Sequence, residues 1–272
     1  MDSRRTVLIT GATDGIGRQT AVELARAGLR VVLHGRSRPR VDEALAYVRA
    51  QVEAPEIDGV SFDLGVPAAV RKGAALVAEK VGRLDVLLNN AGIFAEERLV
   101  TEGGVETTFQ VNHLGHFLLT KLLLPSLRGG GDRPPGRVIN VSSIAHTRGR
   151  IHFDDLSLAK GYSGYAAYAQ SKLANVMHAL ALADREPPDA VLAYSLHPGV
   201  ISTKLLRQGF GPVQGSSVSH GAKTSVMLSV EPQPAPSGAY FAESVATPPA
   251  RAAQDRAQRD RLWDASMELV KE

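Results

Sequence analysis

Residues 6–34 of this 272-residue chain combine a strand, a glycine-rich turn, a helix and a second strand. Residues 6–10 and 31–34 are short, largely apolar runs with β-branched side chains, which predict buried strands. Between them, an amphipathic pattern over 16–27 predicts a helix, and Gly28 is a typical stop signal. Such a βαβ unit joins two parallel strands, so the chain must form a parallel sheet.

The turn itself carries glycines at 11, 15 and 17. In dinucleotide-binding folds, glycines here allow a tight turn, a close approach to a pyrophosphate and close packing of the helix. The helix N-terminus then offers free N–H groups and a positive dipole to that anion. A turn that is rich in glycine for structural reasons alone is the alternative. The strand before it and the helix after it favour nucleotide binding.

The end of the second predicted strand bears on the choice of cofactor. NAD sites place an acidic residue there to bind the ribose 2′-hydroxyl. Residues 34–40 contain no carboxylate and three arginines, Arg36, Arg38 and Arg40. Because a guanidinium can hold a 2′-phosphate through two bonds, we predict NADP(H) over NAD(H), with Arg36 as a contact. A solvated basic turn is the alternative, and it applies first to Arg38.

Alternating strands and helices continue along the chain. We predict further strands at 60–63, 84–88, 137–141, 190–196 and 238–241, and helices at 41–52, 67–81, 104–127, 168–183, 221–230 and 250–270. With nearly continuous apolar strands, this pattern indicates an α/β fold with a mainly parallel, seven-stranded sheet and helices on both faces. Ligands of such sheets bind at the carboxyl ends of the strands, where Arg36, Asp63 and Asn90 fall.

Three segments depart from the regular pattern. Residues 144–167 are rich in glycine and predict an irregular loop over the site. Residues 200–217 contain several glycines and a proline, and we expect residues 200–230 to be a variable, mobile substrate-binding lid. Asn112 interrupts the predicted helix at 104–127 at a cost in helix propensity, so it should serve a purpose. His113 and His116 could chelate a metal, but no further ligand is near, so we expect core or surface histidines and no metal.

Tyr168 and Lys172 are four residues apart, which places them on one face of a helix. A free phenol has a pKa near 10 and holds its proton too tightly for exchange at neutral pH. A nearby ammonium favours the phenolate, so we expect Lys172 to lower the pKa of Tyr168 and make it a general acid and base. The alternative is a solvated lysine beside a half-buried tyrosine. No other tyrosine of the chain has a lysine four residues later.

Composition excludes several classes of protein. The chain has no cysteine, which rules out disulfides, cysteine-based metal sites and thiol nucleophiles. Its net charge of +3 is spread along the chain, whereas nucleic-acid binding needs basic residues clustered on one face. No window reaches the ~18 consecutive apolar residues of a membrane span, and the N-terminal apolar run is too short for a secretory signal. We therefore expect a cytoplasmic protein that binds no nucleic acid.

These motifs together resemble the short-chain dehydrogenase/reductase family over almost the whole chain. The similar positions are Thr10-Gly11-x-x-x-Gly15-Ile16-Gly17, Asp63-Leu64, Asn89-Asn90-Ala91-Gly92, Asn112, Ser143, Tyr168-x-x-x-Lys172 and Pro198-Gly199. The segments 141–146, 149–153, 168–175, 197–203 and 261–266 resemble the retinol-dehydrogenase-like branch. Residues 206–219 match no pattern of that branch.

The resemblance implies a single Rossmann-type, three-layer domain over residues 1–272 and a hydride transfer between NADP(H) and a carbonyl or alcohol. It implies that Ser143 binds the substrate oxygen, that Tyr168 transfers the proton, that Lys172 lowers the pKa of Tyr168 and binds the nicotinamide ribose, and that Asn112 bends its helix and positions a water. It places the cofactor against Gly11, Thr13, Asp14, Gly15, Ile16, Gly17, Arg36, Arg40, Asp63, Leu64, Asn90, Ala91, Gly92, Tyr168, Lys172, Pro198, Gly199, Val200 and Thr203. The branch favours a bulky apolar small molecule, and many family members form homodimers or homotetramers.

Three functions remain open at this point. The first is an NADP(H)-dependent carbonyl reductase or alcohol dehydrogenase. The second is an enzyme of the same fold that recycles the dinucleotide during net non-redox chemistry. The third is a dinucleotide-binding regulator or scaffold without turnover, which has no need to keep Ser143, Tyr168 and Lys172 together.

Overall fold

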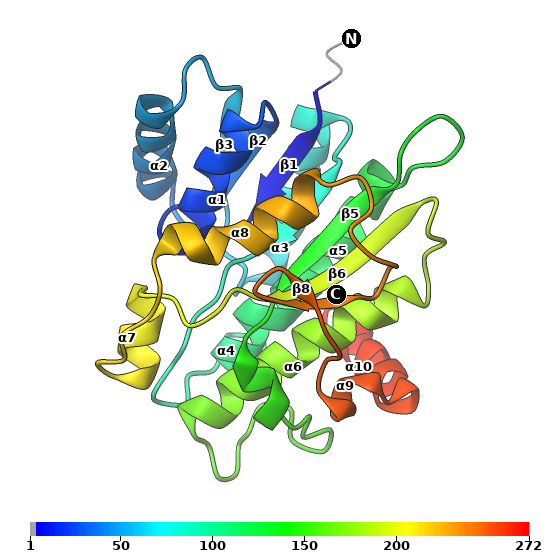
Figure 1. The fold of residues 1–272 in the computed structure, drawn as a ribbon. Coiled ribbons are helices and arrows are strands. Elements are labelled where there is room, and N and C mark those ends of the chain that lie inside the picture. Colours follow the sequence, from blue (N-terminus) through cyan, green and yellow to red (C-terminus); the bar gives the residue numbers. More distant parts are fainter. Residues whose placement is uncertain (1–3, 272) are drawn as a thin grey trace.

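An eight-stranded sheet runs through residues 4–271, which are the residues that the computed structural model describes (Figure 1). Its strands are β1 (Thr6–Ile9), β2 (Arg30–Gly35), β3 (Ile57–Ser61), β4 (Val86–Asn89), β5 (Gly136–Val141), β6 (Val191–His197), β7 (Tyr240–Ala242) and β8 (Val245–Ala246). They lie in the order β3-β2-β1-β4-β5-β6-β7-β8, and all neighbours are parallel except β7 and β8. The predicted α/β fold with a mainly parallel sheet is confirmed.

Helices cover both faces of this sheet (Figure 1). They are α1 (Gly15–Arg26), α2 (Arg38–Gln51), α3 (Pro67–Val81), α4 (Thr107–Phe109), α5 (Gly115–Leu127), α6 (Gly164–Ala183), α7 (Lys204–Phe210), α8 (Val218–Val230), α9 (Arg251–Gln254) and α10 (Arg256–Leu269). Side chains alternate between the faces along each strand. Val7 and Ile9 therefore join an apolar cluster with α1, α2 and α8, while Leu8 joins one with α3, α5, α6 and α10.

Several strand and helix boundaries, and the number of strands, differ from the predicted ones. The predicted strand at 60–63 is β3, Ile57–Ser61, an edge strand whose Asp58 forms ion pairs with Arg30 and Lys80 and so disguises the apolar pattern. The prediction of seven strands is wrong by one, because β8 has only two exposed residues and its turn contains no glycine. The helix of Tyr168 begins earlier than predicted, at Gly164, after the N-cap residue Ser163.

Two predicted helices are divided in the structure. The helix predicted at 104–127 consists of α4, a π-helical segment Gln110–Leu114 and α5, with Asn112 inside the π-helical segment. The helix predicted at 250–270 is divided at Asp255, whose carboxylate caps α10 by accepting from the N–H of Gln258. Hydrophobic periodicity reports neither the change in backbone geometry at 110–114 nor the cap at Asp255.

The connections of the sheet reverse direction at β1. Chain order runs from β1 outward to β2 and β3 on one side, and then returns to β4 on the other side of β1. Such a switch point opens a crevice at the carboxyl ends of the two central strands. The register pairs Ile9 with Leu88, so the turn after β1 and the residues after β4 lie side by side. Among residues 4–271, no helix is both long and apolar enough to cross a membrane.

Candidate active site

Polar bonds join the ends of β1 and β4. The hydroxyl oxygen of Thr10 accepts from the backbone N–H groups of Asn90 and Ala91, at 2.8 and 3.0 Å. The side-chain amide of Asn90 donates to the carbonyl oxygen of Thr10 at 2.7 Å and lies 3.3 Å from that of Gly11. These bonds fix the glycine turn against the segment after β4, so both line the same crevice.

The glycines of the turn are required by this close contact. Gly11 has a φ of +64°, and a Cβ there would lie 2.7 Å from the Cα of Ala91. A Cβ at Gly17 would lie 2.4 Å from the side-chain nitrogen of Asn90. Gly15 has a φ of +54° and opens α1 with almost no neighbour at its Cβ position. The turn is therefore a bare backbone cradle at a helix N-terminus, which fits a dinucleotide pyrophosphate.

Asp14 caps α1, and its carboxylate accepts from the N–H of Gly15 at 2.8 Å. The ammonium of Lys204, the first residue of α7, lies 2.7 Å from the same carboxylate. The hydrogen bond from Lys204 is the main reason why the pKa of Asp14 is lowered. The Asp14–Lys204 ion pair neutralises a carboxylate beside the phosphate cradle and attaches α7 to it. No sequence pattern indicated Lys204.

Thr13 and Ile16 connect the turn with neighbouring elements. Thr13 packs against the end of β2, where a Cβ at Gly35 would lie 2.4 Å from its methyl carbon. Ile16 packs against α8, 3.2 Å from the Cβ position of Gly221. The glycines at 35 and 221 therefore make room for the side chains of the turn, a relation that a single sequence does not show.

Arg36 and Arg40 lie at the outer end of the crevice. Both are exposed, Arg36 directly after β2 and Arg40 in the first turn of α2. Within residues 4–271, neither has a bonded partner, whereas Arg38 forms an ion pair with Asp42 at 2.7 Å. Two free guanidinium groups are therefore available to an anion here, whereas Arg38 is an exposed residue paired on its own helix.

Asp63 and Leu64 follow β3 on the same edge of the sheet. The carboxylate of Asp63 accepts from the N–H of Gly65 at 2.7 Å, which forms a tight turn after the strand. Leu64 is buried, and a Cβ at Gly115 would lie 2.5 Å from its carbonyl oxygen. The structure thus places both residues in a tight turn that follows β3 and packs against the start of α5.

Ser143, Tyr168 and Lys172 meet between β5 and α6. Ser143 follows β5, and its side chain lies beside the phenol of Tyr168, whose pKa it acts to lower. The ammonium of Lys172 lies 5.5 Å from the centre of the Tyr168 ring and donates to the carbonyl oxygen of Val141 at 3.1 Å. Tyr168 is 5% exposed and Lys172 3%. The predicted tyrosine–lysine pair and the serine thus form one buried cluster at the end of β5.

The prediction that Lys172 makes Tyr168 more acidic is wrong for this structure. Burial raises the pKa of Tyr168 to about 12, although the hydrogen bond with Ser143 opposes the rise. Burial also lowers the pKa of Lys172 to about 8. The ammonium lies over the ring and donates to Val141, so it does not offset the loss of water around the phenol. Tyr168 is therefore protonated at neutral pH and is a proton donor in this state.

Asn112 holds the segment after β4 in place. Its side-chain oxygen accepts from the N–H of Ile93 at 2.8 Å, and its amide donates to the carbonyl oxygen of Ile93 and the hydroxyl of Ser171, both at 3.0 Å. A Cβ at Gly92 would lie 3.3 Å from the ammonium nitrogen of Lys172 and 3.6 Å from the side-chain oxygen of Asn112. The absence of a side chain at Gly92 therefore leaves room for the ammonium of Lys172 and the amide of Asn112.

The residues after β6 form the opposite wall. Gly199 follows Pro198 with a φ of +93°, a conformation that favours glycine. Val200 is exposed, and Thr203 caps α7 through its side chain. The methyl carbon of Thr203 lies 3.6 Å from the Cβ position of Gly15, so this wall reaches the phosphate cradle. Of the predicted cofactor residues, Thr203, Asn90 and Ala91 therefore contact the glycine turn.

An aromatic cluster that the sequence did not predict covers the phenol of Tyr168. Phe94, after β4, and Phe210, at the end of α7, each lie 5.8 Å from the Tyr168 ring and 5.6 Å from each other, centre to centre. Leu205 packs against the same cluster. Phe94 could have been suspected from its place two residues after Gly92. Phe210 carries no sequence signal, because it lies in the segment without a pattern.

His113 and His116 are core residues. Both are 1% exposed, and burial lowers the pKa of both. His113 bonds with Ser266 at 2.9 Å and His116 with Thr10 at 2.8 Å. Within residues 4–271, no three histidine or acidic side chains lie where they could hold a metal ion.

A glycine cradle at the switch point, with a Ser–Tyr–Lys cluster at the neighbouring strand end, defines a dinucleotide-binding α/β protein of the oxidoreductase class. The model of the family described as short chain dehydrogenase matches residues 5–210. The chain belongs to this short-chain dehydrogenase/reductase family, whose members bind a nicotinamide dinucleotide, and it lies in the retinol-dehydrogenase-like branch.

Two relatives illustrate the branch. The chain is 39% identical to retinol dehydrogenase 13 of Homo sapiens over 98% of its own length and 84% of the relative's. It is 38% identical to retinol dehydrogenase 12 of Mus musculus over 98% of its own length and 86% of the relative's.

Solved structures share the fold. A putative uncharacterized protein from Mycobacterium Paratuberculosis superposes with a TM-score of 0.80 at 33% identity, over 98% of this chain and 93% of that one. The Pseudomonas aeruginosa RhlG/NADP active-site complex superposes with a TM-score of 0.70 at 25% identity, over 88% of this chain and 94% of that one.

Proposed function

We propose that this protein is an NADP(H)-dependent oxidoreductase that interconverts a carbonyl and an alcohol on a bulky apolar molecule, with Tyr168 as the proton donor and acceptor. The observation that carries this proposal is the buried Tyr168 phenol. It has the side chain of Ser143 beside it, the Lys172 ammonium 5.5 Å from the centre of its ring, and the rings of Phe94 and Phe210 against it.

The cradle and the strand ends would hold the dinucleotide. The turn from Gly11 to Gly17 would bind the pyrophosphate, the ends of β3 and β4 the adenosine and ribose, and Lys172 the second ribose. Thr203 and the backbone after Pro198 would fix the orientation of the nicotinamide ring. When bound, the nicotinamide supplies the hydride in reduction and accepts it in oxidation.

The preference for NADP(H) rests on Arg36 and Arg40. Both are exposed at the end of β2 and are without bonded partners among the described residues, and residues 34–40 contain no carboxylate. A ribose 2′-phosphate would bond with such guanidinium groups, whereas a 2′-hydroxyl needs an acceptor that this turn lacks. The similarity to the Pseudomonas aeruginosa RhlG/NADP complex is consistent with this choice.

The side chains would divide the work at the substrate oxygen. The hydroxyl of Ser143 donates to the carbonyl oxygen and orients it toward the phenol. Tyr168 then delivers its proton to that oxygen as negative charge builds on it. Burial matches this role in reduction, because it keeps the phenol protonated until the substrate oxygen becomes more basic. Asn112 keeps the segment after β4 in position beside them.

The aromatic cluster supports an apolar substrate. Phe94, Phe210 and Leu205 surround the ring of Tyr168, so a substrate at the phenol would contact apolar side chains. The two relatives above are named for retinol, and a substrate of that apolar kind would fit against these side chains. Apolar contact area contributes about 25 cal/mol per Å², so a large apolar molecule gains more from it than a small aldehyde.

We further propose that residues 200–230 include the lid of the site. Backbone bonds of 2.9 and 2.8 Å from Ser202 to Ser216 and from Ser216 to Val200 close the base of the loop that carries α7. Helix α7 contains no buried residue, yet its Phe210 covers the phenol of Tyr168. Few apolar contacts oppose its opening, which would admit the substrate.

A panel of aldehydes, ketones and quinones with reduced nicotinamide tests the proposal. Steady consumption of the reduced cofactor, recorded by its absorbance, supports an oxidoreductase. Conversion of substrate without net consumption would indicate the non-redox alternative. Cofactor binding without conversion of any compound would indicate a regulator or scaffold and contradict the proposal.

A further inference from the structure

His146 lies directly behind Ser143 and has no part in the proposed transfer. It belongs to the short 3₁₀ turn Ile144–Arg148 after β5, whose N-cap is Ser143. Its imidazole is 1% exposed and packs against the ring of Tyr240 in β7, 4.8 Å between centres. A buried polar ring beside a proposed catalytic residue must satisfy both of its nitrogens, and their partners define what it can do.

Both partners of the ring are backbone groups, which fixes the position of its proton. The N–H of Ala250 donates to Nε2 at 3.1 Å, so Nε2 carries a lone pair and no hydrogen. Nδ1 lies 2.7 Å from the carbonyl oxygen of Ser143, which can only accept, so Nδ1 carries the hydrogen. Burial lowers the pKa of His146, in keeping with a neutral ring. The imidazole therefore accepts a hydrogen bond from Ala250 and donates one to Ser143, and the reverse arrangement is not possible.

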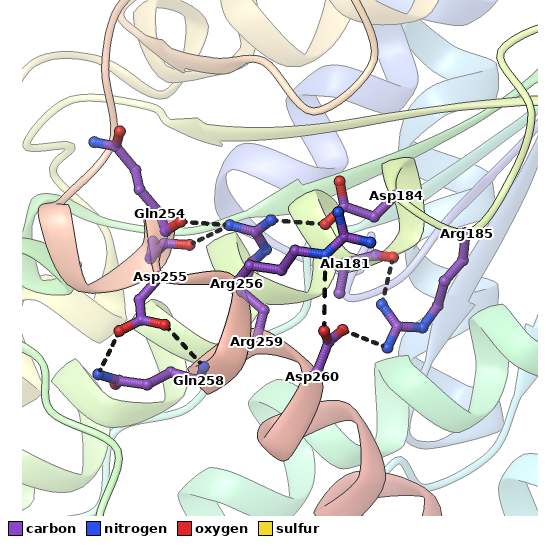
Figure 2. Close-up of polar contacts among 10 residues, drawn as sticks. Ala181, Asp184, Arg185, Gln254, Asp255, Arg256, Gln258, Arg259 and Asp260 are labelled. Carbon is purple, nitrogen blue, oxygen red and sulfur yellow. Dashed lines mark hydrogen bonds and ion pairs between the residues drawn. The ribbon is translucent and has the colours of Figure 1, made fainter.

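The far end of this link is attached to the helix of Tyr168. Ala250 directly precedes α9, which leads into α10. Arg259 of α10 lies 2.6 Å from Asp184, the C-cap of α6, and Asp260 of α10 lies 2.7 Å from Arg185 (Figure 2). The C-terminal segment therefore contacts the loop of Ser143 at one end and the end of α6 at the other.

We propose that His146 is a positioning residue that holds the backbone of Ser143 through this neutral, one-directional link. The hydroxyl of Ser143 accepts from the N–H of Ala145 at 3.2 Å. Its carbonyl oxygen also accepts from the backbone N–H of His146 at 3.1 Å, and the bond from Nδ1, at 2.7 Å, is the shorter of the two. Without the bond from Nδ1 to its carbonyl, the serine moves relative to the phenol and orients the substrate oxygen poorly. The inference rests on the proposed function of Ser143.

Two amide substitutions separate the two bonds of the ring. The amide nitrogen of asparagine takes the place of Nδ1, so His146→Asn keeps the donor to Ser143 and loses the acceptor for Ala250. The amide of glutamine takes the place of Nε2, so His146→Gln keeps the acceptor and loses the donor. We expect His146→Asn to retain kcat within about threefold and His146→Gln to lose about tenfold, the factor of one hydrogen bond. The KM for the cofactor should change less than about twofold in both.

A matched control excludes a general loss of stability. His113→Asn replaces an equally buried histidine that bonds with Ser266 of α10. We expect it to lower the thermal midpoint without lowering kcat below that midpoint. Equal kcat in the two His146 variants, or a larger loss in His146→Asn than in His146→Gln, overturns the inference.

NMR of ¹⁵N-histidine-labelled protein tests the link without turnover. The inference predicts a neutral His146 at pH 7 with a one-bond N–H coupling at Nδ1 and none at Nε2. A proton on Nε2, or a charged ring, overturns it. A wild type that shows this tautomer but reduces no carbonyl contradicts the proposed function and leaves the link in place, so the two failures are distinguishable.

Discussion

Replacing Lys172 by methionine should raise the free energy of unfolding of the protein and lower its turnover. Burial lowers the pKa of Lys172 from 10.5 to about 8, so the charged form is disfavoured in the folded state. One pKa unit corresponds to about 1.4 kcal/mol, and the buried ammonium therefore costs about 3 kcal/mol at pH 7. Methionine fills a similar volume without charge. The carbonyl oxygen of Val141 keeps a donor, the amide of Asn175 at 3.2 Å.

The pH dependence gives this prediction a sign. Below pH 8 the lysine is protonated in both the folded and the unfolded state. The free energy of unfolding of Lys172→Met then exceeds that of the wild type by the full cost of the buried ammonium. Between pH 8 and about 10.5, the unfolded state binds more protons than the folded state, so the wild type gains stability relative to the variant. Urea unfolding at a series of pH values measures the gap, which should shrink toward zero by about pH 10.5.

Two further measurements complete the test. The exposed Lys121→Met, on α5, is the matched control and should leave the unfolding free energy nearly unchanged. Turnover of Lys172→Met should fall at least about tenfold, because methionine cannot bind the nicotinamide ribose as the ammonium is proposed to do. A variant that is less stable than the wild type at pH 7, or a gap that does not change with pH, refutes the reasoning about burial.

The other predictions concern the cofactor and the substrate wall. Arg36→Asp should lower the kcat/KM ratio of NADPH to NADH about tenfold or more, whereas Arg38→Asp, at an arginine already paired, should change it less. Lys204→Gln should raise the dissociation constant of the cofactor several-fold in low salt, because the carboxylate of Asp14 then repels the cofactor phosphates more strongly. Adding Asp14→Asn removes that carboxylate and should restore the dissociation constant. Phe210→Ala should raise KM for large apolar carbonyls and leave small aldehydes unchanged; equal effects on both would contradict a substrate wall.

The sequence predicts the parts of the fold that depend on local pattern. The first strand, its glycine turn and α1 appear where expected, because apolar periodicity, Gly28 and the turn glycines all act within one βαβ unit. The carboxyl ends of parallel strands share an edge, so the positions of Asn90 and Ser143 after the neighbouring strands β4 and β5 predict that both lie at that edge.

Long-range packing explains what the sequence does not reveal. Phe94 and Phe210 meet only when α7 lies over Tyr168. The same position of α7 brings Lys204 to Asp14. The pKa of Tyr168 was predicted in the wrong direction because spacing reports that a lysine is near, not how much water both groups lose. Strand β8 and the π-helical segment depend on backbone geometry that apolar periodicity does not encode.

The kcat of Tyr168→Phe tests the central claim most directly. Phenylalanine keeps the ring against Phe94 and Phe210 but has no proton to give. The account predicts a kcat at least about a hundredfold lower than that of the wild type, with a dissociation constant for reduced cofactor within about twofold. Tyr47→Phe, an exposed tyrosine on α2, should match the wild type. A Tyr168→Phe variant that reduces carbonyls at the wild-type rate would contradict the assignment of the proton donor.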